Sequence, residues 1–490
     1  MSYDVIVVGV GNAAGAAAVS AKEHGAKRVL MLEKAPQVQR GGNTYFSGAI
    51  FRFVFDNVSE LDRFVPGAEK AYPGFHAGVP VYPKAAFEED LLRVTEGRSD
   101  RDLLSTMIDA SYDTSCWMQD VGKHQFELAR SVMGLKVGNQ IKWPRGAILR
   151  TVHEGVGLSE TWLATAQRMG VEIRYESHVL ELTQNSMGRV NGVVVRGPTG
   201  LEKIEANAVV LGCGGFETNP EWRTRYLGQE WGRAKVRGSN FNYGDGLRMA
   251  IDLGAMPWGH WGGCHATPIV ADAPDYGVRN MTDKTNRLSY PFGVMLNMEG
   301  KRWIDEGADF NPFTYAKYGG LILKQTRSMV YQIFDSKAVE LFEPRYWTSE
   351  PLKSDTLEGL VKQMQLDQAQ AMKTLNEYNA ASARGGPFNP AALDKLHTEG
   401  IMPVKSNWAT KLDTPPYYSW AVTGGITFTF GGIKVNPSAQ VISTGWKPID
   451  GLYACGEMVG GLFHYNYALG SGLMSGAVFG RIAGRQAATG

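Results

Sequence analysis

The chain has 490 residues, far more than one domain of about 150 residues, which predicts two or more packed layers. Its 50 Lys and Arg residues balance 49 Asp and Glu residues, for a formal net charge of +1. Proteins that bind nucleic acid or anionic membranes through charge carry a basic surface, so this balance argues against both classes.

Cysteine usage and apolar patterning indicate the compartment. The longest apolar stretch, residues 5–19, is shorter than the ~20 residues that span a bilayer. Asp4 stands where a signal peptide carries positive charge. The four cysteines lack the spacing of a zinc site or a haem attachment and suit a reducing compartment: Cys116, Cys213, Cys264 and Cys455. The sequence therefore predicts a soluble, cytoplasmic protein with no membrane span and no nucleic-acid partner.

The first 33 residues predict a strand, a glycine-rich turn, a helix and a second strand. Residues 4–8 are apolar, the turn occupies 9–15, small residues continue as a helix to Gly25, and a strand runs over 28–33. This order is one βαβ unit. Further on, we expect helices within 84–121, strands at 171–183 and 189–196 around Gly188, and an apolar strand at 208–211 that enters the glycines of 212–215.

A change of composition marks an inserted domain. Between residues 266 and 416 the chain is richer in Tyr, Asn, Pro and Lys, with helices expected within 357–380 and turns at 385–390. After it we expect strands at 417–422, 433–435 and 452–454, a turn at Gly424-Gly425 and a final glycine-rich helix. We therefore predict an α/β fold: a Rossmann-like domain built from 1–265 and 417–490, with an inserted α+β capping domain at 266–416 that holds the substrate.

The glycine turn carries the first functional signal. Gly9, Gly11 and Ala14 follow a strand and open a helix, and Glu33 ends the next strand 22 residues after Gly11. In that context the pattern is typical of dinucleotide binding, because the glycines let a pyrophosphate approach the helix N-terminus and the carboxylate accepts hydrogen bonds from ribose.

Later segments give a resemblance to a known superfamily. In order along the chain these are Gly41-Gly42-Asn43-Thr44, Ser47-Gly48, Gly212 to Phe216, Gly244-Asp245-Gly246 and Cys455-Gly456-Glu457. Together they resemble the fumarate reductase and succinate dehydrogenase flavoproteins. Segments such as 87–98, 300–306, 315–317, 331–335 and 425–432 are most similar to the tricarballylate dehydrogenase group. The resemblance covers nearly the whole chain.

This resemblance implies FAD as the cofactor. No histidine stands in the loop after Gly42 where some members attach FAD covalently, so we expect noncovalent FAD. The last helix should face the flavin with its N-terminus, which stabilises negative charge. The expected cofactor-binding residues are Gly9, Gly11, Asn12, Ala13, Ala14, Glu33, Lys34, Gly41, Gly42, Asn43, Thr44, Ser47, Gly48, Val179, Gly214, Gly215, Asp245, Gly456, Glu457, Gly470, Ser471, Gly472 and Leu473. No metal site is expected.

The substrate motifs of fumarate reductases are only partly present. His265 follows Gly254-Ala255 at the spacing of a family histidine, but Phe310 and Tyr467 stand where a proton-donating and a carboxylate-binding arginine are expected. Paired carboxylates would find no bidentate partner there, so fumarate is an improbable substrate. Tyr467 and Gly470 are instead similar to the tyrosine and glycine with which 3-ketosteroid dehydrogenases hold a carbonyl.

We therefore predict an FAD-dependent oxidoreductase that forms a C=C bond next to a carbonyl or carboxyl group of a small organic substrate. Candidate catalytic residues are Tyr467, His265, His464 and Tyr315; each histidine has the alternative of an interior or packing role, and Tyr315 of packing in the cap. An ene-reductase running the reverse reaction and an electron-transfer subunit of a complex remain as alternatives. No second dinucleotide motif is present, so a protein, quinone or oxygen is the expected electron partner.

Overall fold

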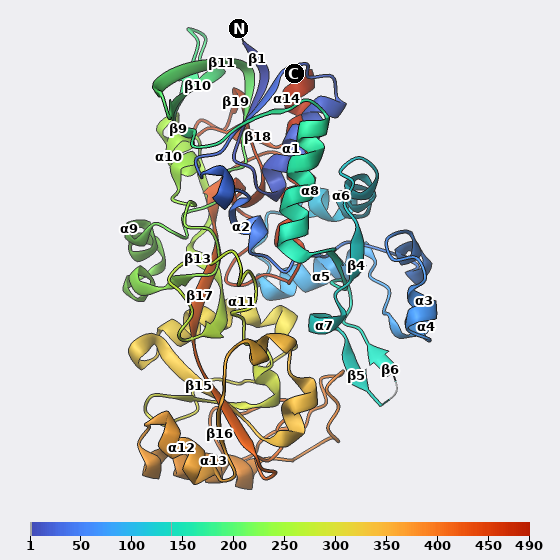
Figure 1. Cartoon of the computed structure of the whole chain (residues 1–490), viewed down its shortest axis with the longest axis vertical. Helices are drawn as coiled ribbons and strands as arrows, with labels where there is room; N and C mark the ends of the chain where they lie inside the picture. Colours follow the sequence, from blue (N-terminus) through green and yellow to red (C-terminus); the bar gives the residue numbers. More distant parts are fainter. Residues whose placement is uncertain (1, 139) are drawn as a thin grey trace.

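The computed structural model describes residues 2–138 and 140–490. Figure 1 shows an elongated molecule, with both termini at one end beside the first and last helices and with strands β15 and β16 at the other end. Two long strands, β13 (Pro257–Val270) and β17 (Tyr417–Ile433), run between these ends. The functional site is therefore built where the two parts of the molecule meet.

The first part is a largely parallel sheet in the order β18-β19-β11-β1-β2-β8. The strands are β1 (Tyr3–Val8), β2 (Val29–Leu32), β8 (Glu172–Arg174), β11 (Gly200–Leu211), β18 (Gln440–Ile442) and β19 (Pro448–Ala454); β10 (Val190–Gly197) pairs with β11, and β9 (His178–Gln184) pairs with β10. Val8 pairs with Leu211 on one side and Leu32 on the other, so three strands end together at one edge. Ligands bind at that edge in open α/β sheets.

Small residues let two helices cross closely over this sheet. The helices are α1 (Asn12–Glu23), which is rich in alanine, and α14 (Ser471–Thr489). A Cβ on Gly480 would lie 2.4 Å from the Ala13 carbonyl oxygen, and one on Gly484 would lie 2.1 Å from that of Ala17. Glycine is thus required for the backbone contact that holds the end of the chain against its beginning.

The second part is a mixed sheet in the order β12-β17-β15-β14, with β13 and β16 also paired to β17. Its other strands are β12 (Lys235–Val236), β14 (Val294–Asn297), β15 (Met329–Phe334) and β16 (Leu352–Ser354). Helix α11 (Tyr315–Leu323) packs against β13 and β17, while α12 (Leu357–Met364) and α13 (Gln368–Ala381) cover a separate apolar cluster at the far end.

The predicted fold class is confirmed, but the turn expected at Gly424-Gly425 and the strand expected at 433–435 are not found, since β17 ends at Ile433. The βαβ unit, the turn at Gly188, the paired helices at 357–381 and the final helix lie where the sequence predicts them. The expected turn at Gly424-Gly425 is instead the middle of β17, because these glycines make room: a Cβ on Gly424 would lie 2.2 Å from the Gly319 oxygen in α11. The division into domains stays a prediction.

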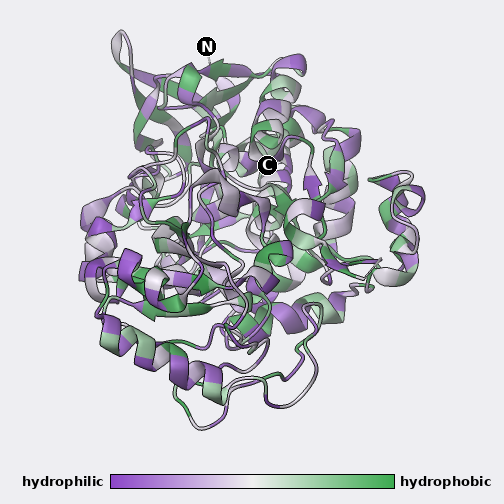
Figure 2. Cartoon of the chain, turned by 60° about the horizontal axis from the view of Figure 1, so that its bottom comes forward, coloured by the Kyte–Doolittle hydropathy of each residue, from purple (hydrophilic) through white to green (hydrophobic). Residues whose placement is uncertain are grey.

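The remaining elements surround the first part. They are α2 (Gly42–Tyr45), α3 (Ala68–Ala71), α4 (Phe75–Gly78), α5 (Lys84–Val94), α6 (Arg101–Asp120), α7 (Arg130–Met133), α8 (Glu154–Arg168), α9 (Pro220–Trp222), α10 (Asp245–Asp252), β3 (Ile50–Phe51), β4 (Phe126–Leu128), β5 (Leu135–Val137), β6 (Gln140–Lys142) and β7 (Leu149–Thr151). The helices on the outside of the molecule carry both hydrophilic and hydrophobic residues, as amphipathic surface helices do (Figure 2).

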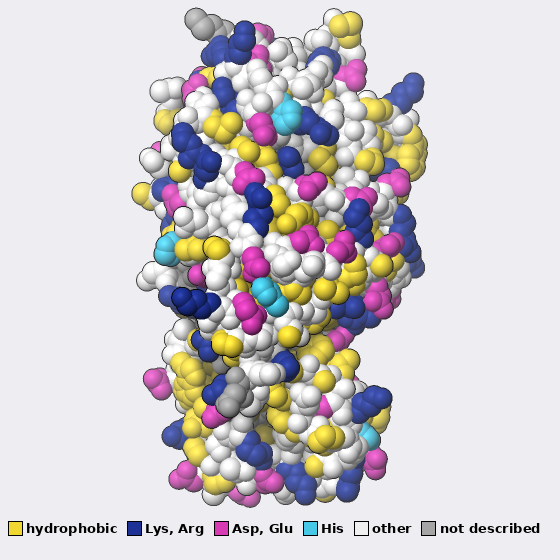
Figure 3. Space-filling model, turned by 90° about the vertical axis from the view of Figure 1, so that its right-hand side faces the viewer, with side chains coloured by type: hydrophobic (Ala, Val, Ile, Leu, Met, Phe, Trp, Pro, Cys, Tyr) yellow, Lys and Arg dark blue, Asp and Glu magenta, His cyan; other side chains and the backbone are white. Residues whose placement is uncertain are grey.

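Charges of both signs are interspersed on the face drawn in Figure 3, in keeping with the net charge near zero. Among residues 2–138 and 140–490, no helix has the length and apolar character to cross a bilayer.

The helix crossing gives a first prediction. Gly484→Ala should lower the melting temperature, because an added methyl group 2.1 Å from a backbone oxygen cannot be relieved by a side-chain rotation. Overpacking costs about 1–3 kcal/mol, which outweighs the ~1 kcal/mol gain in helix propensity. Gly197→Ala is the control, since nothing lies within 4 Å of its Cβ position. Thermal unfolding in which Gly484→Ala melts at or above the wild-type temperature would contradict the close crossing.

Candidate functional site

One large cavity opens at the edge where β1, β2 and β11 end, and it holds about 1800 Å³ of unfilled space, part of it open to solvent. Its wall continues along the starts of α1 and α14 and reaches β13, β17 and α11 of the second part. Nineteen of the predicted cofactor residues line it: Gly9, Gly11, Asn12, Ala13, Glu33, Lys34, Gly42, Asn43, Thr44, Ser47, Gly48, Val179, Gly214, Asp245, Gly456, Glu457, Gly470, Gly472 and Leu473.

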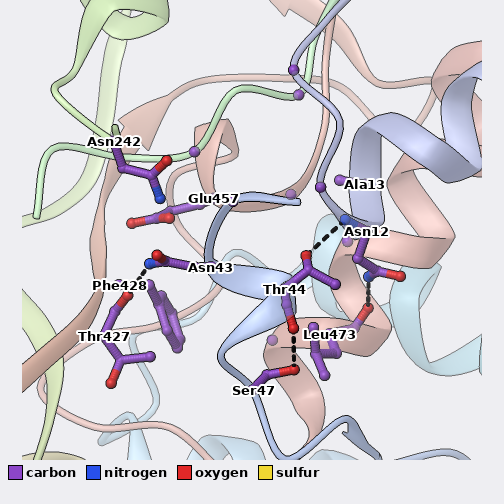
Figure 4. Close-up of a pocket in the computed structure, with 18 of the residues that line it drawn as sticks. Asn12, Ala13, Asn43, Thr44, Ser47, Asn242, Thr427, Phe428, Glu457 and Leu473 are labelled. Carbon is purple, nitrogen blue, oxygen red and sulfur yellow. Dashed lines mark hydrogen bonds between the residues drawn. The ribbon is translucent and has the colours of Figure 1, made fainter. Parts of the chain in front are cut away.

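The glycine turn is fixed by neighbouring backbone. Gly9 has a φ of +102°, and a Cβ there would lie 2.6 Å from the Gly212 oxygen. The next helix begins at Asn12, whose backbone N–H donates to Thr44 Oγ1 at 2.8 Å and whose side-chain amide donates to the Leu473 oxygen at 2.8 Å (Figure 4). The starts of two helices and the loop after β2 therefore converge on the same part of the cavity.

Acidic and basic side chains mark the end of the cavity beside β2. Glu33 is buried and accepts a hydrogen bond from the Ala35 N–H at 2.8 Å, and burial raises its pKa. Lys34 Nζ lies 2.5 Å from Asp245 Oδ2, and His178 Nε2 lies 3.4 Å from the same oxygen. Burial would raise the pKa of Asp245, but His178 and Lys34 bring it down to about 2. Asp245 thus stays ionised and holds Lys34 in place.

Two neighbouring carboxyl groups lie in this region: Glu457 lines the cavity, and Glu217 is buried behind the wall. Glu217 Oε1 accepts from the side-chain amide of Asn43 at 2.5 Å and also from that of Asn242, while Glu457 Oε1 accepts from the Thr429 N–H at 2.6 Å. Figure 4 shows Asn43, Asn242 and Glu457 facing one another. Burial, followed by the charge of Glu457, raises the pKa of Glu217 well above its ordinary value. The pair therefore retains a proton where an exposed carboxyl group would be ionised.

Three of the four predicted catalytic residues meet at the other end of the cavity. The ring of His265, on β13, lies 4.9 Å from that of Tyr315 and 4.8 Å from that of Tyr467, measured between centroids. The hydroxyl groups of Tyr315 and Tyr467 are hydrogen-bonded to each other. Both ring nitrogens of His265 are buried without a hydrogen-bond partner among the described residues. Phe428, opposite His265 in the β13–β17 pairing, forms the apolar side.

His464 does not join this group. Its ring stacks on His260, with centroids 5.6 Å apart and an interplanar angle of 5°, and it is absent from the cavity wall. Four predicted cofactor residues also lie behind the wall: Ala14 packs under Gly212, Gly41 against Ser159, Gly215 against Glu457, and Ser471 donates to the Ala468 oxygen. The roles assigned to these five residues stay predictions. None of the five lines the cavity, so each would act by holding the residues of the wall in place.

The sequence analysis did not predict three charged residues of the wall. Arg237 Nη1 and Arg345 Nη1 each lie 2.5 Å from a different oxygen of Asp283. All three line the cavity, but they come from segments about 50 residues or more apart that share no short motif. Phe428, which also lines this end, lies inside the glycine-flanked segment 425–432 that the sequence analysis had noted.

Comparisons with known proteins agree with this geometry. A family described as "FAD binding domain" matches residues 4–473. The chain belongs to this FAD-binding family. A "probable fumarate reductase" of Shewanella frigidimarina is 30% identical over 490 residues, covering 99% of this chain and 74% of that protein. The structure of the open conformation of a flavocytochrome c3 fumarate reductase has a TM-score of 0.72 and 28% identity, covering 99% of this chain and 78% of that one.

A likeness of fold alone extends further. The structure of 3-ketosteroid delta1-dehydrogenase from Sterolibacterium denitrificans has a TM-score of 0.74 at 18% identity, with 99% of both chains covered. The predicted superfamily and its FAD cofactor are thus confirmed. The flavoprotein is an FAD-dependent oxidoreductase of the type that acts on carbon–carbon bonds.

The cavity fits FAD on its own evidence. The turn at Gly9 admits no side chain, the N-termini of α1 and α14 face the cavity, and Glu33 offers an acceptor at the far end of β2. The glycine turn and the start of α1 suit a pyrophosphate, the start of α14 suits a flavin, and Glu33 suits a ribose. Each individual cofactor contact stays a prediction.

We predict noncovalent FAD, because the loop that follows Gly42 offers Asn43, Thr44 and Tyr45 where covalent members carry a histidine. Acid precipitation of the holoenzyme should release all the yellow chromophore into the supernatant, where chromatography identifies it as FAD. Colour that remains with the precipitated protein would contradict this prediction, and so would FMN in the supernatant.

The carboxyl pair predicts a pH-dependent stability. A carboxyl group whose pKa is raised in the folded state destabilises the protein as pH rises from its ordinary pKa towards the raised value, by up to about 1.4 kcal/mol for each pH unit. Glu217→Gln keeps an acceptor for Asn43 and Asn242 but cannot ionise. The difference between the melting temperatures of Glu217→Gln and wild type should therefore grow in favour of the variant from pH 5.5 to pH 8, with FAD in excess. A constant difference would show that Glu217 is ionised across this range.

Proposed function

We propose that the flavoprotein reduces a C=C bond that is conjugated to a carbonyl or carboxyl group of a small organic substrate. The observation that carries this direction is the joint burial of Tyr315, Tyr467 and His265, with the two hydroxyl groups hydrogen-bonded to each other and the imidazole without a partner among the described residues. Burial raises the pKa of Tyr467 and raises that of Tyr315 further, and it lowers the pKa of His265 well below its ordinary value. At neutral pH the site therefore holds protonated hydroxyl groups and a neutral imidazole.

A site of this kind is better suited to giving a proton than to taking one. When bound, FAD exchanges a hydride with one carbon of the C=C bond. The other carbon then carries negative charge and is a strong base, so that even a weakly acidic phenol protonates it. In the opposite direction, a weakly basic imidazole would have to remove a proton from carbon. Reduction was the alternative in the sequence analysis, and the protonation states favour it.

The hydroxyl pair leaves one proton for the substrate. When one hydroxyl donates to the other, the accepting hydroxyl keeps its own proton, and no other side chain among the described residues accepts that proton. Tyr467 lies just before the start of α14, and Tyr315 is the first residue of α11, so the pair lies between the two parts of the molecule. Closure of the second part over the site would exclude water from the reaction.

Desaturation is the second candidate, and one contact favours it. Burial is the main influence on the pKa of Tyr467 and raises it. The Tyr315 hydroxyl and the backbone N–H of Gly470 are among the groups that lower this pKa. A phenol beside a backbone N–H would stabilise an enolate oxygen and acidify the neighbouring C–H bond. In that case a saturated ketone should reduce the bound flavin, which anaerobic stopped-flow spectroscopy would detect.

The electron partner and the compartment are also proposals. The residues that line the cavity match a site for one dinucleotide, FAD. We therefore propose that electrons arrive from a protein, a quinone or another external donor. A cytoplasmic location is supported by four cysteines that form no disulfide in the structure, of which Cys264 and Cys455 are buried.

Tyr467→Phe tests the proposed function. The variant should keep the fold and FAD but slow reoxidation of the reduced flavin by an unsaturated carbonyl compound about 100-fold or more, because proton donation contributes factors of this size. Tyr465→Phe is the matched control, since that ring is 45% exposed and lies off the cavity wall. Anaerobic stopped-flow spectroscopy measures both rates. A Tyr467→Phe rate within twofold of wild type would mean that the ring only packs.

A further inference from the structure

Arg237 follows β12 at the edge of the cavity and is held by three different segments. Its backbone N–H donates to the Ile426 oxygen at 2.8 Å, which places it beside Thr427 and Phe428 of β17. Its Nε donates to Thr427 Oγ1 at 3.1 Å, and Nη1 donates to Asp283 Oδ1 at 2.5 Å and to the Phe46 oxygen at 3.2 Å. Two of its three nitrogens are therefore fully engaged.

The third nitrogen, Nη2, has no hydrogen-bond partner among the described residues, although Arg237 is only 8% exposed and lines the cavity. Burial is the largest influence on the pKa of both His265 and Tyr467. The charge of Arg237 also influences both of these pKa values, because Arg237 is close to the catalytic end. A donor that is fixed in place, nearly buried and unpaired points to an oxygen acceptor on the substrate.

Geometry and charge together define that acceptor. A carboxylate is bound best by two parallel N–H bonds from one guanidinium, and here Thr427 and Asp283 already occupy Nε and Nη1. Arg345 is equally engaged, because it binds Asp283 through Nη1 and Glu343 through Nη2 and Nε. The formal charges of these two arginines and two carboxylates cancel. The site thus offers one nitrogen and no net charge.

We propose that Arg237 Nη2 binds the oxygen of an uncharged carbonyl group, as in an unsaturated ketone, ester or amide, and that the site discriminates against the corresponding carboxylate. This inference rests on the proposed function and narrows its substrate class. Asp283 is the positioning residue: it orients Arg237 and neutralises the charge that would otherwise attract an anion.

The test compares cinnamamide with cinnamate, which differ in one non-hydrogen atom and in charge. Binding to the holoenzyme with oxidised FAD is measured by isothermal titration calorimetry without an electron donor, so a failure of the reduction assay does not affect it. Wild type should bind cinnamamide at least tenfold more tightly than cinnamate, and Arg237→Gln should weaken cinnamamide binding about tenfold.

Asp283→Asn should shift the preference at least tenfold towards cinnamate, because it frees a guanidinium and removes its countercharge. Asp413→Asn, a change of the same kind at an exposed residue, should leave both affinities unchanged. Equal affinities in wild type, tighter binding of cinnamate, or binding of neither compound would overturn the proposal. An unchanged preference in a folded Asp283→Asn variant would also overturn it. Slow reduction with the predicted binding pattern would instead count against the proposed function alone.

Discussion

Asn12 is the residue on which the assembly of the cofactor site depends. Its backbone N–H binds Thr44, its amide N–H binds the Leu473 oxygen, and its Oδ1 accepts from Trp162 Nε1 at 2.9 Å. One buried residue at the start of α1 thus joins helix α2, the start of α14 and helix α8. Because 461 positions separate Asn12 from Leu473, the cavity forms only when the end of the chain packs against its beginning. The close crossing of α1 and α14 makes this contact possible.

The cofactor half of the site was predictable because its signals are local. Gly9, Gly11 and Glu33 follow strands whose apolar sequence is plain, and each residue type has a direct physical reason at its position. The glycines at 424 and 425 show the limit of this reasoning. A pair of glycines is a strong turn signal, but here it serves a close approach between β17 and α11 that only the folded chain reveals.

The substrate half was predictable only in part. His265 and Tyr467 were found through spacing, and Tyr315 joins them across 152 positions of sequence. Arg237, Asp283 and Arg345 carry no motif, since their meaning comes from ion pairs between separate segments. Arginines therefore do line the substrate end of the cavity, but their charges are already paired with carboxylates of the protein. The inference of a less charged substrate, first drawn from Phe310 and Tyr467, therefore gains an independent physical basis.

A crystal structure of the holoenzyme with bound cinnamamide would test the central claim most directly. The C=C bond should lie between the flavin ring and the Tyr315–Tyr467 hydroxyl pair, with one hydroxyl oxygen within about 3.5 Å of the carbon that receives the proton. A flavin ring bound elsewhere, or a ligand whose C=C bond faces away from both hydroxyl groups, would contradict the proposed function and the role given to this end of the cavity.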